Sequence, residues 1–343
     1  MTLILGIETS CDETSVAIVK DGREILSNIV SSSEKFHAVW GGIVPEIASR
    51  KQLEYLPLAI KSALAEANVT PKDIDAIAMA NGPGLIGSLV VGLMGAKTFA
   101  YVHNIPIIGV NHLEAHLYAN WLREEGDIRP EPQLPAIVLV VSGGHSHMIH
   151  MRDHGEYEIL GRTLDDAPGE TLDKAARILD LGYPGGPAID KISKSGDRNA
   201  VKFPQAMLNN TLDFSFSGVK TSLSTYLKKA ETSGEKLDVA DIAASFQEAV
   251  MQVLITKLFM ATDKYQPNQL VLAGGVAANS RLRELALQRG EREGISVSVP
   301  PFKLCTDNGA MVAAAGYRHF LKDNFADLRL DVKASMPLVK PAL

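Results

Sequence analysis

The chain of 343 residues lacks several features that mark particular classes of protein. No apolar run reaches the roughly 18 residues that a membrane span needs, so the sequence predicts no transmembrane helix. The two cysteines, Cys11 and Cys305, form neither a C-x-x-C pair nor a disulfide framework, which is typical of a reducing cytoplasm. The opening MTLILGIETSCDETS has no basic stretch before its apolar residues, which argues against a secretory signal. We therefore expect a cytoplasmic protein with no membrane association.

An excess of positive charge is also missing. Lysine and arginine number 34 against 40 aspartates and glutamates, which gives a net charge of −6. Such a chain has no overall attraction for nucleic acid, so RNA binding would need a local basic face or a partner protein. The candidate residues for that face are Arg50, Lys51, Lys220, Arg281 and Arg283.

The first part of the chain has the pattern of an α/β domain. Alternating apolar residues at 3–7 and 15–19 flank a polar turn and predict a β-hairpin, with a third strand at 24–30. Pro45 suits the first turn of a long helix. The apolar face expected for that helix consists of Ile47, Leu53, Leu56, Leu58, Ile60 and Leu64. Further on we expect a strand at 74–80, a helix at 89–102, and a strand at 107–110 that leads into a helix at His112.

The second part repeats this order. Residues 136–141 and 146–151 predict another hairpin around a turn of small residues, followed by a strand at 157–163. A strand at 269–273, a glycine loop and a helix at 280–291 match the corresponding run of the first part. Prolines and charges at 125–135 indicate a linker. The expected domains are residues 1–124 and 136–307, with a C-terminal helical segment, 308–343, that returns to the first domain.

This duplicated arrangement resembles the ATP-binding fold of actin, the sugar kinases and Hsp70. In that fold two α/β domains enclose a nucleotide-binding cleft, and the turns of their hairpins face it. Backbone N–H groups in such turns and at helix N-termini bind anions without needing a lysine. The resemblance therefore implies a nucleotide or phosphorylated ligand.

Two histidines one helical turn apart suggest a metal site. His112 and His116 in NHLEAH lie at positions i and i+4, so both imidazoles can reach a single ion. Asp307 in LCTDNGA can supply a distant carboxylate that closes the site. An H-x-x-x-H pair alone is a weak signal, because it often arises by chance.

Three glycine-containing loops are candidates for phosphate or nucleoside binding. Residues 82–88 have the glycine spacing of a P-loop, but Ser88 replaces the essential lysine, so the glycines fit close helix packing better. The loop SGGH at 142–145 follows a buried strand and leaves amides accessible for phosphate. In the loop at 274–279, Asn279 can contact a ribose or base, or can simply cap the following helix.

An acidic pair, Asp12 and Glu13, lies at the turn of the first hairpin. These carboxylates could orient a substrate or assist a proton transfer, and the alternative is an ordinary solvated turn. Cys11 beside them is better explained as a small buried residue than as a nucleophile, since no histidine lies near it in sequence.

Ten motifs, in order along almost the whole chain, carry a more specific resemblance. They are GIETSCDET, GGIVPEIASR, NGPGLIGSL, NHLEAH, VVSGGHS, DDAPGETLDK, YPGGP, FSFSGVKT, AGGVAANSRLR and CTDNGAM. Together they resemble the tRNA N6-adenosine threonylcarbamoyltransferase family, whose bacterial members are called TsaD and whose relatives were once described as O-sialoglycoprotein endopeptidases. One departure is Gln52, where many relatives have histidine.

The resemblance implies roles for individual residues. His112, His116 and Asp307 match the ligands of one divalent metal ion, iron(II) in preference to zinc. The positions that match the substrate-binding set are Val140, Val141, Ser142, Gly143, Gly144, Asp173, Gly186, Asp190 and Asn279.

The resemblance also implies a reaction and partners. The threonylcarbamoyl group of ATP-derived threonylcarbamoyl-adenylate is transferred to N6 of the adenosine 3′ of the anticodon, in tRNAs that read codons beginning with A, and AMP leaves. The implied partners are tRNA, a threonylcarbamoyl-adenylate synthase, a paralogous TsaB-like subunit on the N-terminal domain, and a TsaE-like P-loop ATPase.

Other functions fit the residues less well. A metalloprotease of the H-E-x-x-H type needs a glutamate directly after the first histidine, where this chain has Leu113. A small-molecule kinase of the same fold would hold Mg²⁺ through oxygen ligands and would not need two imidazoles. A carbamoyltransferase with another acceptor stays open, while a complete metal triad argues against a non-catalytic scaffold.

Overall fold

The computed structural model describes residues 1–207, 211–234 and 237–339. The chain forms two compact units, and the first of them is discontinuous in sequence. Unit 1 comprises Met1–Glu131 and Thr306–Leu343, and unit 2 comprises Pro132–Cys305. The break between them thus falls within the segment expected to be a linker.

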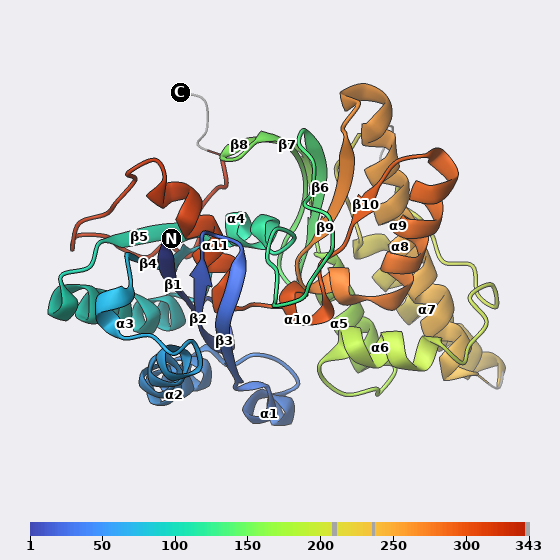
Figure 1. The fold of residues 1–343 in the computed structure, drawn as a ribbon. Helices are drawn as coiled ribbons and strands as arrows, with labels where there is room; N and C mark the ends of the chain where they lie inside the picture. Colours follow the sequence, from blue (N-terminus) through green and yellow to red (C-terminus); the bar gives the residue numbers. More distant parts are fainter. Residues whose placement is uncertain (208–210, 235–236, 340–343) are drawn as a thin grey trace. The chain divides into compact units, whose positions relative to one another are not determined.

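Unit 1 is built on a five-stranded mixed sheet with the order β3-β2-β1-β4-β5. The first three strands are antiparallel neighbours, and β4 and β5 run parallel to β1. The strand bounds are β1 Leu3–Glu8, β2 Glu13–Lys20, β3 Glu24–Ser32, β4 Ala76–Gly82 and β5 Ile107–Asn111. The helices are α1 Glu34–His37, η1 Ala38–Trp40, α2 Pro45–Glu66, η2 Pro71–Asp73, α3 Ile86–His103, α4 His112–Tyr118 and α11 Gly309–Phe320. The hairpin predicted from the alternating apolar residues is confirmed (Figure 1).

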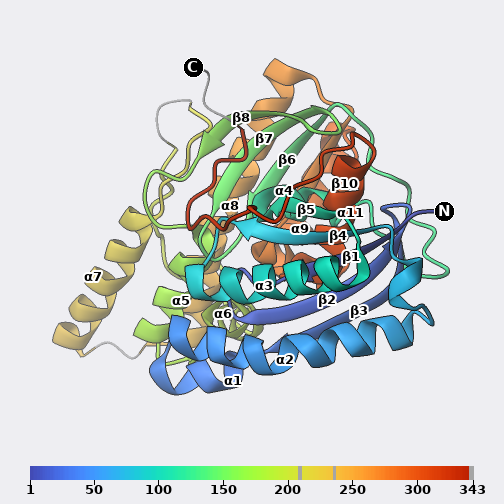
Figure 2. The same cartoon turned by 90° about the vertical axis from the view of Figure 1, so that its left-hand side faces the viewer.

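Successive side chains of β1 point to opposite faces of this sheet, and their sizes determine which helices pack on each face. Leu3, Leu5 and Ile7 belong to one apolar core with residues of α2 and α3, which lie side by side along the sheet (Figure 2). On the opposite face, α11 packs closely because β1 presents Gly6 there. A Cβ atom on Gly6 would lie 2.1 Å from the carbonyl oxygen of Gly309. The last helix therefore packs against the sheet of the first residues.

The buried face of α2 agrees with the predicted one only in part. Leu56 is buried, and Ile60 and Leu64 pack against the core. Leu53 and Leu58, however, are 68% and 65% exposed. The buried residues of α2 are Ala48, Gln52, Leu56, Ala59 and Ala63, which recur at helical spacing. The prediction chose the largest apolar residues, whereas close packing of α2 on the sheet and on α3 selects small ones.

Unit 2 repeats the sheet of unit 1 with the order β10-β9-β6-β7-β8. Again a hairpin and a third antiparallel strand are followed by strands parallel to the first. The strand bounds are β6 Ala136–Val141, β7 Ser146–Asp153, β8 Glu156–Arg162, β9 Gln269–Ala273 and β10 Val297–Ser298. The helices are α5 Pro168–Ile178, α6 Gly185–Ser193, α7 Ser217–Ser233, α8 Val239–Tyr265, η3 Gly275–Ala278, α9 Ser280–Glu293 and α10 Phe302–Cys305. The predicted duplication of an α/β plan is confirmed.

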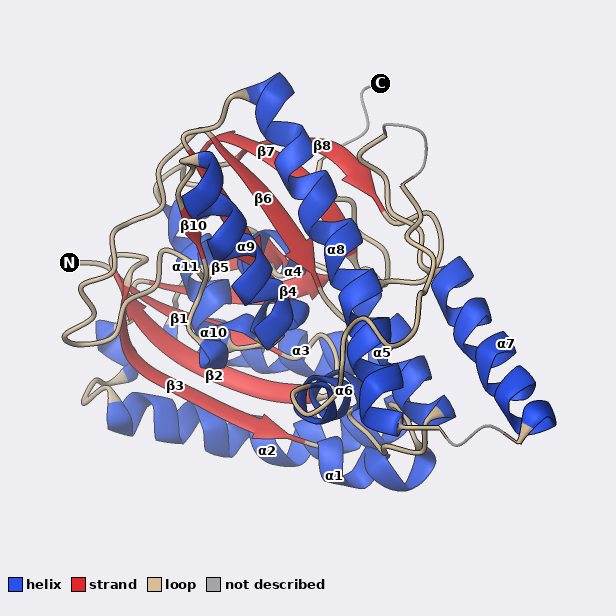
Figure 3. Ribbon diagram, turned by 90° about the vertical axis from the view of Figure 1, so that its right-hand side faces the viewer, coloured by secondary structure: helices blue, strands red, loops and turns tan. Residues whose placement is uncertain are grey.

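The core of unit 2 is organised around α8. Ile137, Leu139 and Val141 of β6 share an apolar cluster with this helix, which lies over the sheet (Figure 3). By length and composition alone, α8 and α3 could cross a membrane. However, 83% of the apolar window of α8 is buried inside the unit, and α3 packs on α2 and β4. Both helices thus have a place in the folded units.

Candidate functional site

The two predicted metal-binding histidines lie on α4, which begins directly after β5. Asn111 fixes this start, because its side-chain oxygen accepts hydrogen bonds from the backbone N–H groups of Leu113 and Glu114. The side-chain nitrogen of Asn111 donates to the carbonyl oxygens of Met336 and Pro337. The C-terminal segment therefore braces the helix that carries both histidines.

Asp307 joins the two histidines within unit 1. Its Oδ1 lies 3.2 Å from Nε2 of His116 and 3.7 Å from Nε2 of His112. The two imidazole rings are 4.7 Å apart between centroids, and one ligand atom from each of the three residues lies within 4.8 Å of the others. Asp307 is held just before α11, where Asn308 caps the helix by accepting from the N–H of Met311. The structure thus brings together the three residues that the sequence singled out.

The hydrogen bonds around the histidines fit a metal ion. Glu8 and Ser10 both lie 3.1 Å from Nδ1 of His112, which leaves Nε2 directed at Asp307. Both ring nitrogens of His116 are buried and have no hydrogen-bond partner among the described residues. Two imidazoles and one carboxylate form a ligand set that suits zinc or iron and leaves coordination positions for a further ligand.

The electrostatics of His112 point the same way. Burial lowers its pKa, but the carboxylates of Asp307 and Glu8 outweigh that effect and raise the pKa to about 9. The cluster therefore attracts positive charge to this position, whether as a proton or as a cation.

Glu8 is a functional candidate that the sequence reasoning missed. It is buried, and its second oxygen accepts from the N–H of Ser10 at 2.5 Å. The available signal was an acidic residue at the end of an apolar strand that runs parallel to the one preceding His112. The carboxyl ends of parallel strands meet at one edge of a sheet, so Glu8 and His112 could have been placed together.

The acidic pair of the first hairpin lies near the same cluster. Burial raises the pKa of Glu13 well above its usual value, and the charges of Asp307 and Asp12 raise it further. The same causes raise the pKa of the Cys11 thiol, with burial the largest. The alternative of a freely solvated turn therefore does not describe Glu13, and Cys11 is poorly suited to act as a thiolate.

The SGGH loop of unit 2 follows β6, where Val140 and Val141 are buried. The turn is closed by hydrogen bonds in both directions between Ser142 and His145. A Cβ atom added to Gly143 or Gly144 would meet nothing within 4 Å, so the backbone of these glycines borders open space. This openness is what an amide cradle for a phosphate requires.

The remaining substrate-binding candidates of unit 2 form a connected group. Oδ1 of Asp173 accepts from the N–H groups of Gly185 and Gly186, at 2.9 and 3.1 Å. Burial raises the pKa of Asp173 and outweighs these bonds. Asp190, on the helix that begins with Gly185, accepts from the N–H and hydroxyl of Ser280. The group thus links α5, α6 and the start of α9.

Asn279 caps helix α9, which is one of the two roles predicted for it. Its side-chain oxygen accepts from the N–H groups of Arg281 and Leu282, and its nitrogen donates to Oε1 of Gln247 at 2.8 Å. The side chain is therefore committed to the protein, and a ribose contact by Asn279 stays a prediction.

The glycine loop at 82–88 serves packing, as expected, but its neighbour is the C-terminal segment. The carbonyl oxygen of Lys333 lies where a Cβ atom of Gly82 would be, at 2.4 Å. Hydrogen bonds join Asn81 to the N–H of Lys333 and the N–H of Gly84 to Ala334. The segment 308–343 was expected to return to this domain, but the sequence did not indicate that it would pack on the glycine loop.

Most of the basic residues suggested for RNA binding are engaged elsewhere. Lys220 pairs with Asp166 at 2.6 Å, and Arg281 pairs with Glu248 at 2.6 Å. Arg283 donates to the backbone of Ala277 and of Pro300. Arg50 and Lys51 are also ion-paired, with Glu46 at 2.6 Å and Glu54 at 2.8 Å. Arg50 has a largely exposed side chain, and those of Lys51 and Lys220 are partly exposed.

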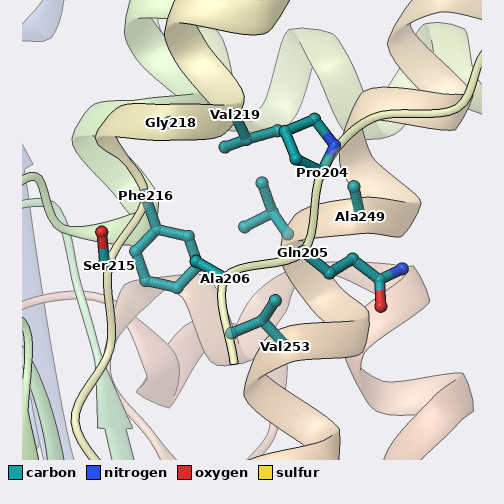
Figure 4. Close-up of a pocket in the computed structure, with 10 residues that line it drawn as sticks. Pro204, Gln205, Ala206, Ser215, Phe216, Gly218, Val219, Ala249 and Val253 are labelled. Atoms are coloured by element: carbon teal, nitrogen blue, oxygen red, sulfur yellow. The ribbon is translucent and has the colours of Figure 1, made fainter. Parts of the chain in front are cut away.

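A pocket in unit 2 lies apart from the predicted site residues. It is bordered by the segment 204–206, by the start of α7 with Phe216 and Val219, and by Ala249, Val250 and Val253 of α8 (Figure 4). Its lining is mainly apolar, and none of the predicted catalytic, metal or substrate residues contributes to it. It lacks the convergent polar groups of a typical ligand site.

Comparisons with known proteins bear on the family. The sequence model described as tRNA N6-adenosine threonylcarbamoyltransferase, TsaD, matches residues 24–314. A protein of that name from Clostridium botulinum (strain Kyoto / Type A2) is 49% identical over 336 residues, which cover 98% of this chain and 97% of that one. Another from Desulfitobacterium hafniense (strain Y51) is 51% identical over 329 residues, 96% of this chain and 95% of that one.

Solved structures support the fold at much lower identity. HypF of T. kodakarensis is similar with a TM-score of 0.58 and 16% identity, over 94% of this chain and 48% of HypF. Component A of the Acidaminococcus fermentans (R)-2-hydroxyglutaryl-CoA dehydratase has a TM-score of 0.54 and 17% identity, over 94% of this chain and all of that one. These likenesses confirm the duplicated fold predicted from the sequence. From the sequence matches over nearly its whole length, the chain belongs to the tRNA N6-adenosine threonylcarbamoyltransferase family.

Proposed function

We propose that this chain transfers the threonylcarbamoyl group of threonylcarbamoyl-adenylate to N6 of the adenosine 3′ of the anticodon, in tRNAs that read codons beginning with A, and releases AMP. The observation that carries the proposal is the 49% identity over 98% of the chain to a protein of that name. The cluster of His112, His116 and Asp307 adds chemical support, because the reaction builds negative charge that a cation can offset.

His112, His116 and Asp307 would hold one divalent ion, which we propose to be iron(II) rather than zinc. Such an ion supplies Lewis acidity, which stabilises charge on the carbamoyl oxygen and on the departing phosphate. Glu8 accepts from Nδ1–H of His112, so Nε2 is the nitrogen left to bind an ion, which would displace the proton that Nε2 carries in its absence. His116 contributes two buried nitrogens that make no hydrogen bond in the described structure, and Nε2 faces Asp307, which fits a ligand position.

The loop and helix starts of unit 2 would bind the adenylate. The open backbone of Ser142, Gly143 and Gly144, at the end of the buried Val140 and Val141, can direct N–H groups at the phosphate. For the nucleoside we propose Asp173, Gly186, Asp190 and Asn279, the connected group at the starts of α6 and α9.

Asp12 and Glu13 are proposed to manage the proton of the attacking amine. A proton acceptor works best when its pKa approaches the working pH. The raised pKa of Glu13 brings it closer to that condition than a solvated carboxyl would be. Asp12 would orient the amine beside it.

The metalloprotease alternative gains no support. Glu114 on α4 bonds to His319 at 2.9 Å. The position directly after the first histidine, where a zincin has its glutamate, is Leu113.

The partners follow from the same proposal. The exposed apolar side chains of α3 form a stripe at helical spacing, and a TsaB-like paralogue could cover it. The stripe consists of Ile86, Val90, Met94 and Tyr101, which are 47%, 39%, 54% and 76% exposed. We further propose that a synthase supplies the adenylate, that a TsaE-like P-loop ATPase completes the assembly, and that the assembly works on tRNA in the cytoplasm.

A reconstituted reaction tests this function. The chain is incubated with the synthase, the TsaB-like and TsaE-like proteins, threonine, bicarbonate, ATP and unmodified tRNA, and the digested tRNA is analysed by mass spectrometry. We expect threonylcarbamoyladenosine to form only when the chain is present. If the adenylate accumulates and the tRNA stays unmodified in the complete mixture, the transfer function is wrong.

A further inference from the structure

Gln52 of α2 is buried, and its side chain lies against the turn of the first hairpin. Its Nε2 lies 2.9 Å from the carbonyl oxygen of Cys11, 3.0 Å from that of Glu13 and 3.4 Å from that of Thr9. Only the NH₂ end of the amide can donate to carbonyl oxygens, so these contacts fix the orientation of the side chain. A single residue thus contacts three alternate carbonyl groups of the turn.

The two intervening carbonyl groups of the turn are held from other directions. The carbonyl oxygen of Ser10 accepts from the N–H of Leu85 at 2.8 Å. That of Asp12 accepts from the N–H of Ser33 at 3.1 Å and from its hydroxyl at 2.8 Å. All carbonyl oxygens from Thr9 to Glu13 are therefore hydrogen-bonded, as buried backbone groups usually are.

A buried histidine orients the Ser33 hydroxyl that donates to Asp12. The N–H of Val44 donates to Nδ1 of His37 at 3.2 Å, so the ring proton lies on Nε2. That nitrogen donates to the hydroxyl oxygen of Ser33 at 2.9 Å, and the hydroxyl proton is then directed at Asp12. The turn is held between α2 on one side and the segment that follows β3 on the other.

The side chains of this turn reach the metal-ligand candidates. The hydroxyl of Ser10 lies 3.1 Å from Nδ1 of His112, and its N–H donates to Glu8. Glu13, proposed to handle the proton, belongs to the same turn, and Gln52 donates to its carbonyl oxygen. A shift of the turn would therefore displace groups that orient one ligand and groups proposed to handle the proton.

We infer that Gln52 is a positioning residue for the transfer reaction, because its amide fixes the turn that carries Glu13 and sets Ser10 against His112. The inference rests on the proposed function. The buried Oε1 of Gln52 has no partner among the described residues, which costs stability and gains nothing by itself. The donor end therefore explains why an amide occupies this position.

Three substitutions of Gln52 separate the effect of its hydrogen-bond donor from the effect of its side-chain shape. Gln52→Met keeps the length and removes the donor, Gln52→Glu places a carboxylate against three carbonyl oxygens, and Gln52→His returns one N–H donor. The matched control is Leu56→Met, one turn further along the same buried face of α2 and directed at α3. Volume-conserving swaps of this kind are usually well tolerated.

The first measurement is the visible absorption of the Co²⁺-loaded chain, which reports ligand geometry without any reaction. We expect Gln52→Met and Gln52→Glu to alter the Co²⁺ bands, Gln52→His to restore them, and Leu56→Met to leave them unchanged. The second measurement is transfer: kcat should fall about 10- to 100-fold in Gln52→Met, with KM for the adenylate within about 3-fold, since misplacement acts on the transition state. Gln52→His should recover most of that loss.

Ser33→Ala is a second and milder way to disturb the turn, because it removes only the hydroxyl donor to Asp12. It should shift the Co²⁺ bands and kcat in the same direction as Gln52→Met does, but by less. Wild-type Co²⁺ bands and kcat in both Gln52→Met and Ser33→Ala would overturn the inference, as would equal effects in Leu56→Met. If the wild-type chain modifies no tRNA, the proposed function fails, while the Co²⁺ spectra still decide whether Gln52 positions the turn.

Discussion

Replacing Glu8 by glutamine should weaken metal binding without unfolding the chain. One oxygen of Glu8 accepts from Nδ1–H of His112 at 3.1 Å, and the other accepts from the N–H of Ser10 at 2.5 Å. A glutamine has one oxygen and one NH₂ group, so whichever way it turns, a donor faces one of these N–H groups. The isosteric variant can satisfy both contacts only if Nδ1 of His112 becomes the acceptor, and that tautomer places the proton on Nε2, the nitrogen that would bind the ion.

The size of the effect follows from the role of Glu8 as an orienting group. Mutation of a residue that orients a metal-binding histidine typically costs about 10- to 100-fold in metal affinity, which corresponds to about 1.4 to 2.8 kcal/mol. Glu8 is 1% exposed, so water cannot replace the lost contact and the upper half of that range is expected.

The assay is a competition titration of the chelator-stripped chain with Zn²⁺ or Fe²⁺ against a chromophoric chelator. Glu114→Gln is the matched control, because Glu114 is also a buried carboxylate bonded to a histidine, His319, outside the cluster. Far-UV circular dichroism checks the fold of both variants. Equal metal affinity in Glu8→Gln and the wild type, or an equal loss in Glu114→Gln, would refute the reasoning.

Three further predictions concern stability, each measured by urea unfolding. Gly6→Ala should lose about 1–3 kcal/mol or more, because the added Cβ would lie 2.1 Å from a carbonyl oxygen of α11, and an unchanged midpoint would contradict that close approach. Lys257→Met should lose about 1–3 kcal/mol, because its buried ammonium donates to the carbonyl oxygens of Met207, Thr211 and Asp213, and a more stable variant would contradict this. Burial raises the pKa of Asp165, but hydrogen bonds from Ser215, Phe216 and Ser217 outweigh this effect and lower the pKa overall. The carboxylate therefore stabilises the fold at pH values above its unfolded pKa of about 3.9. This contribution is lost as the pH falls through the lower pKa of the folded state. The stability difference between the wild type and Asp165→Ala should therefore shrink on going from about pH 7 to about pH 3, and a constant difference would exclude this origin.

The sequence predicted the sheets well because their signals are local. Alternating apolar residues identified both hairpins, and the repeat of strand, glycine loop and helix identified the duplication. On α2 the prediction was right for Leu56 and wrong for Leu53 and Leu58. Apolar character alone does not reveal that the alanines of α2 permit close packing on the sheet. Boundaries and packing faces depend on distant partners.

For the site, too, local sequence signals led to correct predictions, whereas long-range contacts were missed. His112, His116 and Asp307 were found by spacing and resemblance, and the structure brings them together. Glu8 and Gln52 were missed or left unexplained, because their importance lies in hydrogen bonds that form only in the folded unit. For the same reason the sequence could not show that Lys220, Arg281 and Arg283 are engaged inside unit 2.

The most direct test of the account is the rate of transfer to tRNA as a function of metal bound to the chain. The chelator-stripped protein is loaded stepwise with Fe²⁺ under anaerobic conditions, and threonylcarbamoyladenosine formed from supplied adenylate and tRNA is measured at each step. We predict that the rate rises in proportion to occupancy, reaches its plateau at one ion per chain, and stays near zero in His116→Ala at any loading. A full rate in the stripped protein, or in His116→Ala, would contradict the account.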